Sequence, residues 1–579
     1  MHETWRAAYQ RWLNFPALDA EMRSALDAIQ TDQSLVVEHF YRTIDFGTGG
    51  MRGELGPGTN RINIYTIRKA TEALSRYLLS QGEQARQSGV VIAYDSRHKS
   101  PLFAEEAAKV LGKHGIRVYL FDRVFPTPIL SFAVRHLAAI AGIVITASHN
   151  PASYNGYKVY GSDGAQITPD TADKLMALIQ ETGDELAIEV ADERELRQTG
   201  MLSTIGDSVL EAYLEQVKSI RLHTHLSASA RDDVRIIFTP LHGTTGEAIS
   251  KGLAAFGYQQ VALVQEQADP DPDFSSVSSP NPEDPQAFAL AIRDAKAAHA
   301  DLIIGTDPDG DRIGVLVKNM TGDYVPLTGN QIGALLLYDV LNQKKNKGTL
   351  PDNGIMMKTI VTSELGSQIA RDFGLVTEDT LTGFKYIGEK IAEYEKSGQY
   401  VFQFGYEESY GMLVGDFVRD KDAVQSALLL ADLCTYHKAR KESLLDALQQ
   451  LFDRYGFYCE ELHTLTYKGI QGVESMTAMM SSLRSTPLPS LLGYRVIYRE
   501  DYLEGIRFDL EKGSCEPLML PRSDVLKFGL EGDAWFCIRP SGTEPKIKLY
   551  IGTKGTSLED STEKLALLKQ ELIRLIGSP

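Results

Sequence analysis

Two short motifs place residues suited to phosphoryl and metal chemistry directly after apolar stretches. The motif TASHNP, at residues 146–151, follows the apolar stretch Ala141–Ile145, which predicts a buried strand. The motif DPDGDR, at residues 307–312, follows the apolar stretch Leu302–Ile304. Ligands of open α/β sheets bind where strands give way to loops. We therefore expect the two motifs to combine a hydroxyl that carries phosphate, on Ser148, with a hard cation that neutralises its charge.

The aspartates of the second motif could bind one cation. Asp307, Asp309 and Asp311 occupy alternate positions, so their carboxylates would converge if the loop curls. Oxygen-only ligation favours Mg²⁺, Ca²⁺ or Mn²⁺. An EF-hand is excluded, because Arg312 stands in the place of its glycine and Lys318 in the place of its final glutamate. A phosphoaspartate enzyme and a solvated acidic turn are the alternatives.

Ser148 is a candidate phosphoserine and a poor candidate for acyl hydrolysis. No G-x-S-x-G elbow surrounds it. His149 is its neighbour in sequence, and we expect it to be badly placed as a base toward that serine. A phosphoserine at the cation fits better, because its phosphate oxygen would complete the shell of the ion. A lone surface or capping serine is the alternative.

Three further motifs offer groups suited to anions and sugar hydroxyls. RPSGTEPK, at residues 539–546, combines a guanidinium, two hydroxyls and a flexible backbone, which suits a phosphate that does not react. It lacks the Walker A lysine spacing. GYEESYG, at residues 405–411, offers carboxylates and a hydroxyl to a sugar, and FGTGGMRG, at residues 46–53, offers a glycine-rich backbone to an anion. A turn or a plain loop is the alternative for each.

Alternating strands and helices are predicted to position these motifs. Strands at 90–94 and 116–121 flank a helix at 103–114 that ends at Gly115. This order indicates βαβ units and a largely parallel sheet. The pattern restarts near Arg235 and again at Gly354, so we expect three α/β segments that each run a strand into a polar loop.

The rest of the chain does not follow this alternation of strands and helices. The first ~40 residues predict one or two helices from their apolar spacing. The five prolines within 269–285 predict a loop, and the basic segment 343–347 is interpreted as a surface loop. Toward the C-terminus, the pattern predicts an α+β domain. Its expected elements are strands at 494–498, 505–510 and 534–538 and a helix at 558–576.

Composition limits the class of protein. The 579 residues, 43% of them hydrophobic, predict several domains. The net charge of −18 argues against nucleic acid or an anionic membrane as partner. No apolar run is long enough to cross a bilayer, and the first residues lack the order of a signal peptide. Four scattered cysteines favour free thiols in a reducing cytosol, so we expect a cytoplasmic monomer or dimer.

Taken in order, the motifs resemble those of the α-D-phosphohexomutase family, in the branch closest to phosphoglucomutase and phosphopentomutase enzymes. TASHNP resembles the phosphoserine loop, DPDGDR the metal loop, GYEES the sugar loop and RPSGTEPK the phosphate loop. TGFKYIG, at residues 382–388, resembles a further loop that helps to recognise the sugar. The resemblance covers the chain from about Ile44 onward. It implies four domains around a central cleft: three similar α/β domains with mixed sheets and a C-terminal α+β domain.

The domain bounds that we expect are 1–40 for a helical extension, then 41–205, 206–322, 323–450 and 451–579. Closure of the last domain, hinged between Arg440 and Tyr458, is expected to exclude water from the cleft.

The resemblance also implies an activity and its residues. It implies the interconversion of glucose 1-phosphate and glucose 6-phosphate through phosphorylated Ser148 and glucose 1,6-bisphosphate, with one Mg²⁺ per chain and a sugar bisphosphate as primer. Ser148 and the three aspartates would bind the metal ion, His149 and Lys158 would be catalytic, and Lys158 would be the general acid/base. The implied substrate-binding residues are Thr48, Arg52, Arg97, Arg312, Gly383, Phe384, Lys385, Glu407, Ser409, Lys421, Arg539, Ser541, Gly542 and Thr543.

Other readings of the same residues stay open at this point. Mannose, ribose or deoxyribose 1-phosphate could be the better substrate, and Tyr406, directly before the carboxylates of the sugar motif, leaves the choice between hexose and pentose open. A non-catalytic sugar-phosphate sensor and a metal-dependent phosphatase are the alternatives outside the mutase class.

Overall fold

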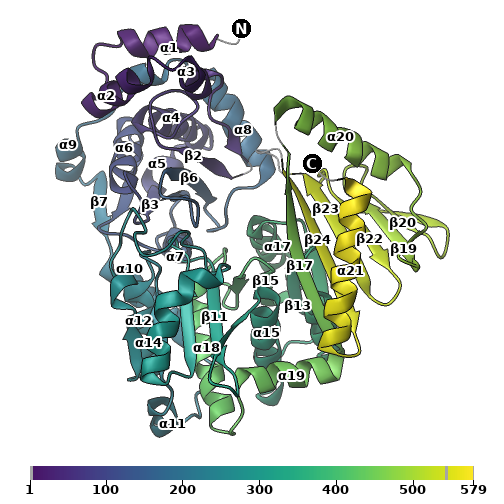
Figure 1. Ribbon diagram of the computed structural model, residues 1–579. Helices are drawn as coiled ribbons and strands as arrows, with labels where there is room; N and C mark the ends of the chain where they lie inside the picture. The colour runs from purple at the N-terminus through teal and green to yellow at the C-terminus, as the bar shows by residue number, and fades with distance from the viewer. Residues whose placement is uncertain (1–3, 48, 468, 541–545, 578–579) are drawn as a thin grey trace.

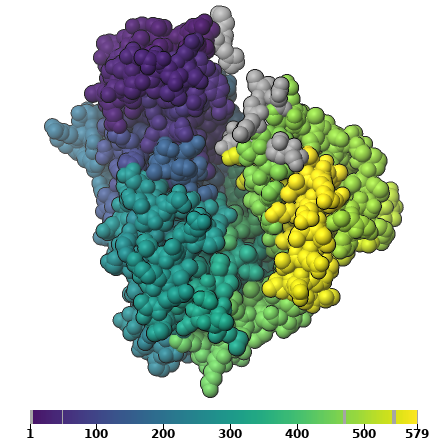
Figure 2. All heavy atoms as spheres, in the orientation of Figure 1, coloured from purple at the N-terminus to yellow at the C-terminus, as the bar shows by residue number. Residues whose placement is uncertain are grey.

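The strands of the protein form four sheets in a computed structural model that describes residues 4–47, 49–467, 469–540 and 546–577. We name the domains by their strands: β1–β7 form domain 1, β8–β12 domain 2, β13–β16 domain 3 and β17–β24 domain 4. The predicted order of three α/β domains and a C-terminal sheet domain is confirmed (Figure 1). Figure 2 shows the surface hollowed between the teal part of domain 2 and the green-to-yellow domain 4.

The N-terminal extension packs on domain 1. Its helices are α1 (Trp5–Asn14), α2 (Ala20–Ile29) and α3 (Gln33–Phe40), so the prediction of one or two helices is wrong. Asp19 and Asp32 explain the difference, because each side chain caps the N-terminus of a new helix by accepting backbone N–H groups. Trp12 anchors the layer: its indole N–H donates to Glu185 Oε1 at 2.8 Å.

Domain 1 has a mixed sheet with the strand order β1-β2-β6-β5-β3-β4-β7. Strands β5, β3, β4 and β7 run parallel, while β6 and β2 are antiparallel additions beside β5. The predicted helix at 103–114 is confirmed as α6, with Gly115 following at φ 70°. The strands are β1 (Phe46–Gly47), β2 (Gly50–Glu54), β3 (Val90–Tyr94), β4 (Val118–Phe121), β5 (Ala141–Ile145), β6 (Tyr154–Gly161) and β7 (Leu202–Ile205). The helices are α4 (Ile64–Ser80), α5 (Gln84–Ser88), α6 (Ser100–Lys113), α7 (Thr127–His136), α8 (Pro169–Glu181), η1 (Glu185–Ala187), α9 (Glu193–Gln198) and α10 (Asp207–Ser219).

Domain 2 carries the acidic motif at the turn of an antiparallel strand pair. Its sheet has the order β12-β11-β10-β8-β9, and β10 pairs with β11 on either side of residues 307–312. The loop predicted at 269–285 is confirmed, since no helix or strand begins there before η2. The strands are β8 (Ile236–Thr239), β9 (Val261–Leu263), β10 (Leu302–Thr306), β11 (Ile313–Lys318) and β12 (Tyr324–Leu327). The helices are α11 (Ala228–Asp232), α12 (Gly246–Phe256), α13 (Gln265–Ala268), η2 (Pro285–Phe288) and α14 (Ala289–Ala298).

Domain 3 has the strand order β14-β13-β15-β16. The surface loop predicted at 343–347 is wrong, because residues 343–346 form the last turn of α15 and Lys347 is its C-cap. A capping box at Thr328 starts this helix, and its apolar face keeps it in the core. The strands are β13 (Gly354–Thr359), β14 (Val376–Thr380), β15 (Val401–Glu407) and β16 (Gly411–Leu413). The helices are α15 (Gly329–Asn346), α16 (Glu364–Asp372), α17 (Phe384–Ser397), α18 (Ala423–Lys438) and α19 (Leu444–Tyr455).

Domain 4 has the strand order β17-β24-β23-β22-β19-β20-β21, with β18 paired to β19. The strands predicted in this region are confirmed as β19, β20 and β23, and the predicted terminal helix as α21. The strands are β17 (Phe457–Thr466), β18 (Ser490–Leu491), β19 (Tyr494–Asp501), β20 (Ile506–Asp509), β21 (Ser514–Pro517), β22 (Leu526–Leu530), β23 (Ala534–Pro540) and β24 (Lys546–Gly555). The helices are α20 (Gly469–Ser485) and α21 (Leu558–Ile576).

An apolar cluster joins domain 4 to domain 3. It combines Ile360, Val361 and Leu381 of domain 3 with Trp535 and Tyr550 of domain 4. Burial of this kind stabilises a contact by roughly 25 cal/mol per Å² of apolar surface. Within the described ranges, no helix combines the length and the apolar composition that crossing a bilayer requires.

Candidate active site

Ser148 lies in the loop between β5 and β6 and faces the acidic motif of domain 2. Its hydroxyl donates to Asp307 Oδ2 at 2.6 Å, and the residue is 3% exposed. Its φ of 52° lies in the left-handed region, which costs free energy for a residue other than glycine. The backbone N–H of Ser148 donates to Thr146 Oγ1 at 2.8 Å and so supports this turn. The serine hydroxyl and the acidic motif are therefore in contact, as we expected from the sequence.

His149 contacts the serine hydroxyl, contrary to our expectation that it would be badly placed. Its Nδ1 lies 3.1 Å from Ser148 Oγ. An extended backbone would send neighbouring side chains to opposite sides, but the left-handed φ of Ser148 breaks that alternation. Burial, and then the positive charges of Arg312 and Arg52, lower the pKa of His149 well below its usual value. The imidazole is therefore neutral near pH 7, and its lowered pKa makes it a weak base.

Arg97 holds the serine loop in place instead of facing a ligand. Its guanidinium donates to the carbonyl oxygens of Ser148 at 2.6 Å, Pro151 at 2.7 Å and Tyr154 at 3.0 Å, and also to that of Asn150. The side chain is fully buried. Direct substrate binding, which we predicted for Arg97, is therefore corrected to support of the loop that carries Ser148.

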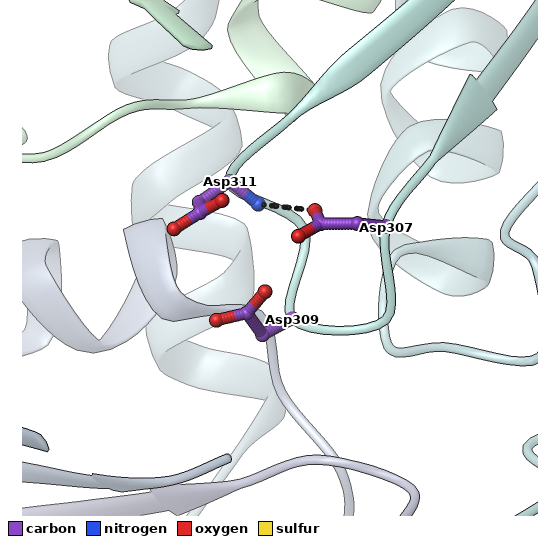
Figure 3. Close-up of side chains that lie close together, drawn as sticks. All are labelled: Asp307, Asp309 and Asp311. Atoms are coloured by element: carbon purple, nitrogen blue, oxygen red, sulfur yellow. Dashed lines mark hydrogen bonds between the residues drawn. The ribbon is translucent and has the colours of Figure 1, made fainter. Parts of the chain in front are cut away.

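The three aspartates converge on one space (Figure 3). One carboxylate oxygen of each lies within 4.8 Å of the other two, and all three side chains are buried. Asp307 Oδ1 accepts the backbone N–H groups of Asp311 at 3.1 Å and Arg312 at 2.9 Å, which closes the loop. Burial and the charges of the other two aspartates raise the pKa of Asp307 well above its usual value.

This donor set fits a hard divalent cation. The Oδ1 atoms of Asp309 and Asp311 are buried and have no hydrogen-bond partner among the described residues. A buried carboxylate oxygen without a donor is costly, and a cation bound by oxygen ligands removes that cost. The geometry of the acidic triad therefore fits a divalent cation.

Two lysines from different domains contact the triad. Lys158 Nζ, on β6, donates to Asp309 Oδ2 at 2.8 Å and lies 3.7 Å from Asp311 Oδ2. Lys421 Nζ, from domain 3, donates to Asp311 Oδ2 at 2.6 Å. Burial opposes the charged form of Lys158, but the charges of Asp309 and Asp311 outweigh it and raise the pKa of Lys158. Burial also opposes the charged form of Asp309 and would raise its pKa. The charge of Lys158 is the largest opposing effect, and the pKa of Asp309 is lowered overall.

The predicted arginines Arg52 and Arg312 flank this centre. Arg312 contacts Glu283 through Nη1 and lies 3.8 Å from Asp311 Oδ1 through Nε. Arg52 is exposed and donates to Asn150 Oδ1 at 3.1 Å. Both guanidinium groups remain close to the serine loop, where they can contact an anionic ligand.

One carboxylate of the sugar motif, that of Glu407, is buried and held by a backbone hydrogen bond. Glu407 Oε1 accepts the backbone N–H of Gly383 at 2.9 Å, which joins the two predicted sugar loops. Burial, opposed by the charge of Lys421, raises the pKa of Glu407 to about 7. Ser409 is half-buried at the end of the same motif. Glu408 Oε2, by contrast, accepts the hydroxyls of two threonines of domain 3, Thr359 and Thr362, each at 3.0 Å.

Two aromatic residues of these loops belong to the core. Phe384, which we predicted to bind substrate, is 3% exposed and packs in the apolar core, because the first turn of α17 points it inward. Only its backbone can face a ligand. Tyr406 is 0% exposed and its ring packs against Gly333 and Gly366. Its side chain is therefore part of the core of domain 3.

A second positive cluster combines residues of domains 3 and 4. Lys548 of β24 pairs in register with Arg539 of β23. Burial, and then the charge of Arg539, lower the pKa of Lys548. Burial also lowers the pKa of Lys385 on α17 to about 8, and Arg539 adds to that effect. Because these positive charges repel one another, a bound anion would stabilise their charged forms. The predicted residues Thr48, Ser541, Gly542 and Thr543 lie outside the described residues.

Two residues of the site were missed by the sequence analysis. Lys548 belongs to the strand after the phosphate motif, and the alternation in KIK was the signal that could have found it. Thr127, at the start of α7, donates its backbone N–H to the Asp309 carbonyl at 2.8 Å and its hydroxyl to Asp309 Oδ2 at 3.2 Å. No local pattern indicated this contact between domains 1 and 2.

The raised pKa of Glu407 predicts a pH-dependent effect of Glu407→Gln on stability. A carboxyl whose folded pKa lies above the usual 4.5 contributes stability at low pH that is lost as the pH rises through about 7. The amide has no charge to bury, so the stability of the variant relative to the parent should rise by about 2 kcal/mol from pH 5 to pH 8. Denaturant unfolding at both pH values measures this difference. Glu393→Gln, at an exposed glutamate, is the control. If Glu407→Gln differs from the parent in unfolding free energy by the same amount at both pH values, the carboxyl of Glu407 does not have a raised pKa.

Family models match most of the chain. The models described as "Phosphoglucomutase/phosphomannomutase, alpha/beta/alpha domain" I, II and III match residues 43–185, 211–322 and 328–455. A phosphoglucomutase of Staphylococcus aureus (strain bovine RF122 / ET3-1) is 38% identical over 550 residues, which cover 93% of this chain and 97% of the relative. A phosphoglucomutase of Staphylococcus aureus (strain USA300) is 39% identical over 528 residues, 91% of this chain and 93% of the relative.

Solved structures share the fold at lower identity. A putative phosphomannomutase from Thermus thermophilus aligns with a TM-score of 0.66 at 23% identity, over 92% of this chain and 99% of that chain. The open form of a Paramecium phosphoglucomutase, parafusin, aligns with a TM-score of 0.67 at 15% identity, over 92% and 95%. With the site geometry and the three matched domains in their expected order, the chain belongs to the phosphoglucomutase/phosphomannomutase family of isomerases, the α-D-phosphohexomutases.

Proposed function

We propose that this protein interconverts glucose 1-phosphate and glucose 6-phosphate through a phosphoserine at Ser148. The observation that carries the proposal is the 2.6 Å contact between the Ser148 hydroxyl and Asp307 within a buried acidic triad. The Staphylococcus aureus relatives that match over almost their whole length are named phosphoglucomutases, which supports glucose phosphates as the substrates.

The chain's own groups position the reactants and move the protons. The phosphoryl group on Ser148 passes to a free hydroxyl of the sugar monophosphate and gives a bisphosphate. Lys158 lies beside Asp309 and can move the proton of the sugar oxygen: as the neutral amine it accepts the proton of the attacking hydroxyl, and as the resulting ammonium group it returns that proton to the leaving oxygen in the second transfer. Arg52 and Arg312 stabilise the negative charge of the transferring group. Phosphoryl transfer requires mainly such positioning and charge neutralisation.

One Mg²⁺ held by Asp307, Asp309, Asp311 and phosphorylated Ser148 would supply further charge neutralisation to the transferring oxygens. The same residues also fit Mn²⁺. A sugar bisphosphate would prime the enzyme by phosphorylating Ser148, and the free cysteines among the described residues agree with a reducing cytoplasm.

The second positive cluster anchors the phosphate that does not react. Arg539, Lys385 and Lys548 form a group of cations whose charges act on one another, which suits a phosphate that stays bound. The bisphosphate must turn end over end before the return transfer, so this site has to accept either phosphate. Both domains 3 and 4 contribute to it. A movement of domain 4 about its apolar contact with domain 3 would therefore release the ligand and, on closing, exclude water.

Product analysis tests this proposal. With glucose 1-phosphate, Mg²⁺ and a trace of glucose 1,6-bisphosphate, we expect glucose 6-phosphate without free phosphate. Release of inorganic phosphate would identify a phosphatase, and the absence of any product would identify a sensor, and either result contradicts the proposal. A comparison of kcat/KM for glucose, mannose and ribose 1-phosphates should rank glucose first. A higher value for mannose or ribose would transfer the proposal to phosphomannomutase or phosphopentomutase activity.

A further inference from the structure

The segment 419–422 of domain 3, between β16 and α18, contacts three parts of the protein. Its members Asp420 and Asp422 are buried. Asp420 Oδ2 accepts the hydroxyl of Tyr160, on β6 of domain 1, at 2.7 Å. Lys421 reaches the metal loop of domain 2, and Asp422 accepts the hydroxyl of Tyr213, on α10, at 2.8 and 2.7 Å. The three side chains are therefore neighbours in sequence but contact different parts of the protein.

Lys421 spans the distance between the sugar motif and the metal loop. Its aliphatic chain lies on Gly411, the last residue of GYEESYG, where a Cβ would come 2.1 Å from Lys421 Cδ. Its ammonium group then reaches Asp311 Oδ2 at 2.6 Å. A lysine side chain has several rotatable bonds and is costly to order, so a fixed backbone at Lys421 is needed to aim the ammonium group.

Asp420 fixes that backbone. Its Oδ1 accepts the N–H of Lys421 at 2.8 Å while its Oδ2 is held by Tyr160. Tyr160 is 0% exposed and stands two residues after Lys158 on the same strand. The strand that carries Lys158 to Asp309 therefore also sets the position of Lys421 at Asp311. Strand β6 therefore positions both ammonium groups at the acidic triad, that of Lys158 directly and that of Lys421 through Tyr160 and Asp420.

We propose that Asp420, held by Tyr160, is a positioning residue that aims Lys421 at the metal loop from the sugar side of the cleft. The inference rests on the proposed phosphoryl transfer for its kinetic consequence, but the position of Lys421 is measurable without turnover. Asp422 offers the contrast: its side chain caps α18 by accepting the N–H of Gln425 at 2.9 Å, and its contacts do not include Lys421.

Tyr160→Phe and Tyr213→Phe form a matched pair for the kinetic test. Each removes one buried hydroxyl that donates to an aspartate of the same segment, so each should lower Tm by a similar amount. Only Tyr160→Phe should lower kcat, by about tenfold with KM within about twofold, because it frees Asp420 and displaces Lys421. Asp420→Ala, which removes the acceptor of the Lys421 N–H, should reproduce that loss. Equal kcat for the two tyrosine variants would overturn the proposal.

A second measurement follows Lys421 without relying on turnover. Lys421 is 12% exposed through its side chain, so it should resist reductive methylation, mapped by peptide mass spectrometry. In Tyr160→Phe the methylation rate of Lys421 should rise about fivefold, and in Tyr213→Phe it should stay at the parent's value. Failure of glucose phosphate turnover in the parent protein would reject the proposed function and leave this readout intact. Unchanged methylation of Lys421 in Tyr160→Phe would reject the positioning role alone.

Discussion

Ser148→Ala is expected to abolish mutase turnover while leaving the fold intact. The hydroxyl is the atom that carries the phosphoryl group, so its loss removes the chemical step and not merely a contact. Structural cost should be small, because the side chain contributes little packing and its hydrogen bond joins it to an aspartate that the loop backbone already holds. Alanine is also tolerated poorly at the φ of 52°, as serine is, so the backbone strain is unchanged.

The measurement is glucose 6-phosphate formation in the presence of primer, together with Tm. Ser153→Ala is the control, since Ser153 is exposed in the same loop. We expect the control to retain the parent's rate and Ser148→Ala to fall to background, with both melting near the parent's temperature. Near-normal activity in Ser148→Ala would refute the phosphoserine.

Asp309→Asn is expected to weaken divalent-cation binding and to lower kcat on the order of a thousandfold or more, about 4 kcal/mol in the barrier. Asp309 provides a buried oxygen without a donor for the cation, and its other oxygen holds Lys158. The amide keeps the shape but loses the charge, so both functions weaken together. Asp307 and Asp311 remain, which leaves a weaker cation site and not an absent one.

Mg²⁺ titrations of kcat and calorimetric binding of Mn²⁺ check this result. Exposed Asp323→Asn provides a control with the same change of charge. The required Mg²⁺ concentration should rise for Asp309→Asn and stay at the parent's value for the control. A variant with the parent's kcat and the parent's Mg²⁺ dependence would show that the acidic triad does not hold the catalytic cation.

The sequence could predict those parts of the site that follow from local patterns. Ser148 and the three aspartates each follow a buried strand, and strand ends of neighbouring sheets define where ligands bind. The terminal helix α21 was predictable with its bounds because its apolar spacing is regular and capping at Ser557 marks its start.

Other parts depend on contacts that no local pattern contains. Lys421 reaches Asp311 across 110 residues, and Tyr160 reaches Asp420 across 260. A motif in the sequence also does not reveal which way its side chains face: Arg97 donates to the backbone of its own domain, and Phe384 enters the core. His149 illustrates the same limit, because the left-handed turn that brings it to the serine hydroxyl is a property of the folded loop.

The central claim is that one serine oxygen carries the phosphoryl group between sugar phosphates. Its most direct test is to load the protein with radiolabelled glucose 1,6-bisphosphate, map the labelled residue by mass spectrometry, and chase with unlabelled glucose 1-phosphate. We predict label on Ser148 alone, followed by its transfer to sugar phosphates and not to water. Label on Asp307 or another side chain, or release of the label as inorganic phosphate, would contradict the account.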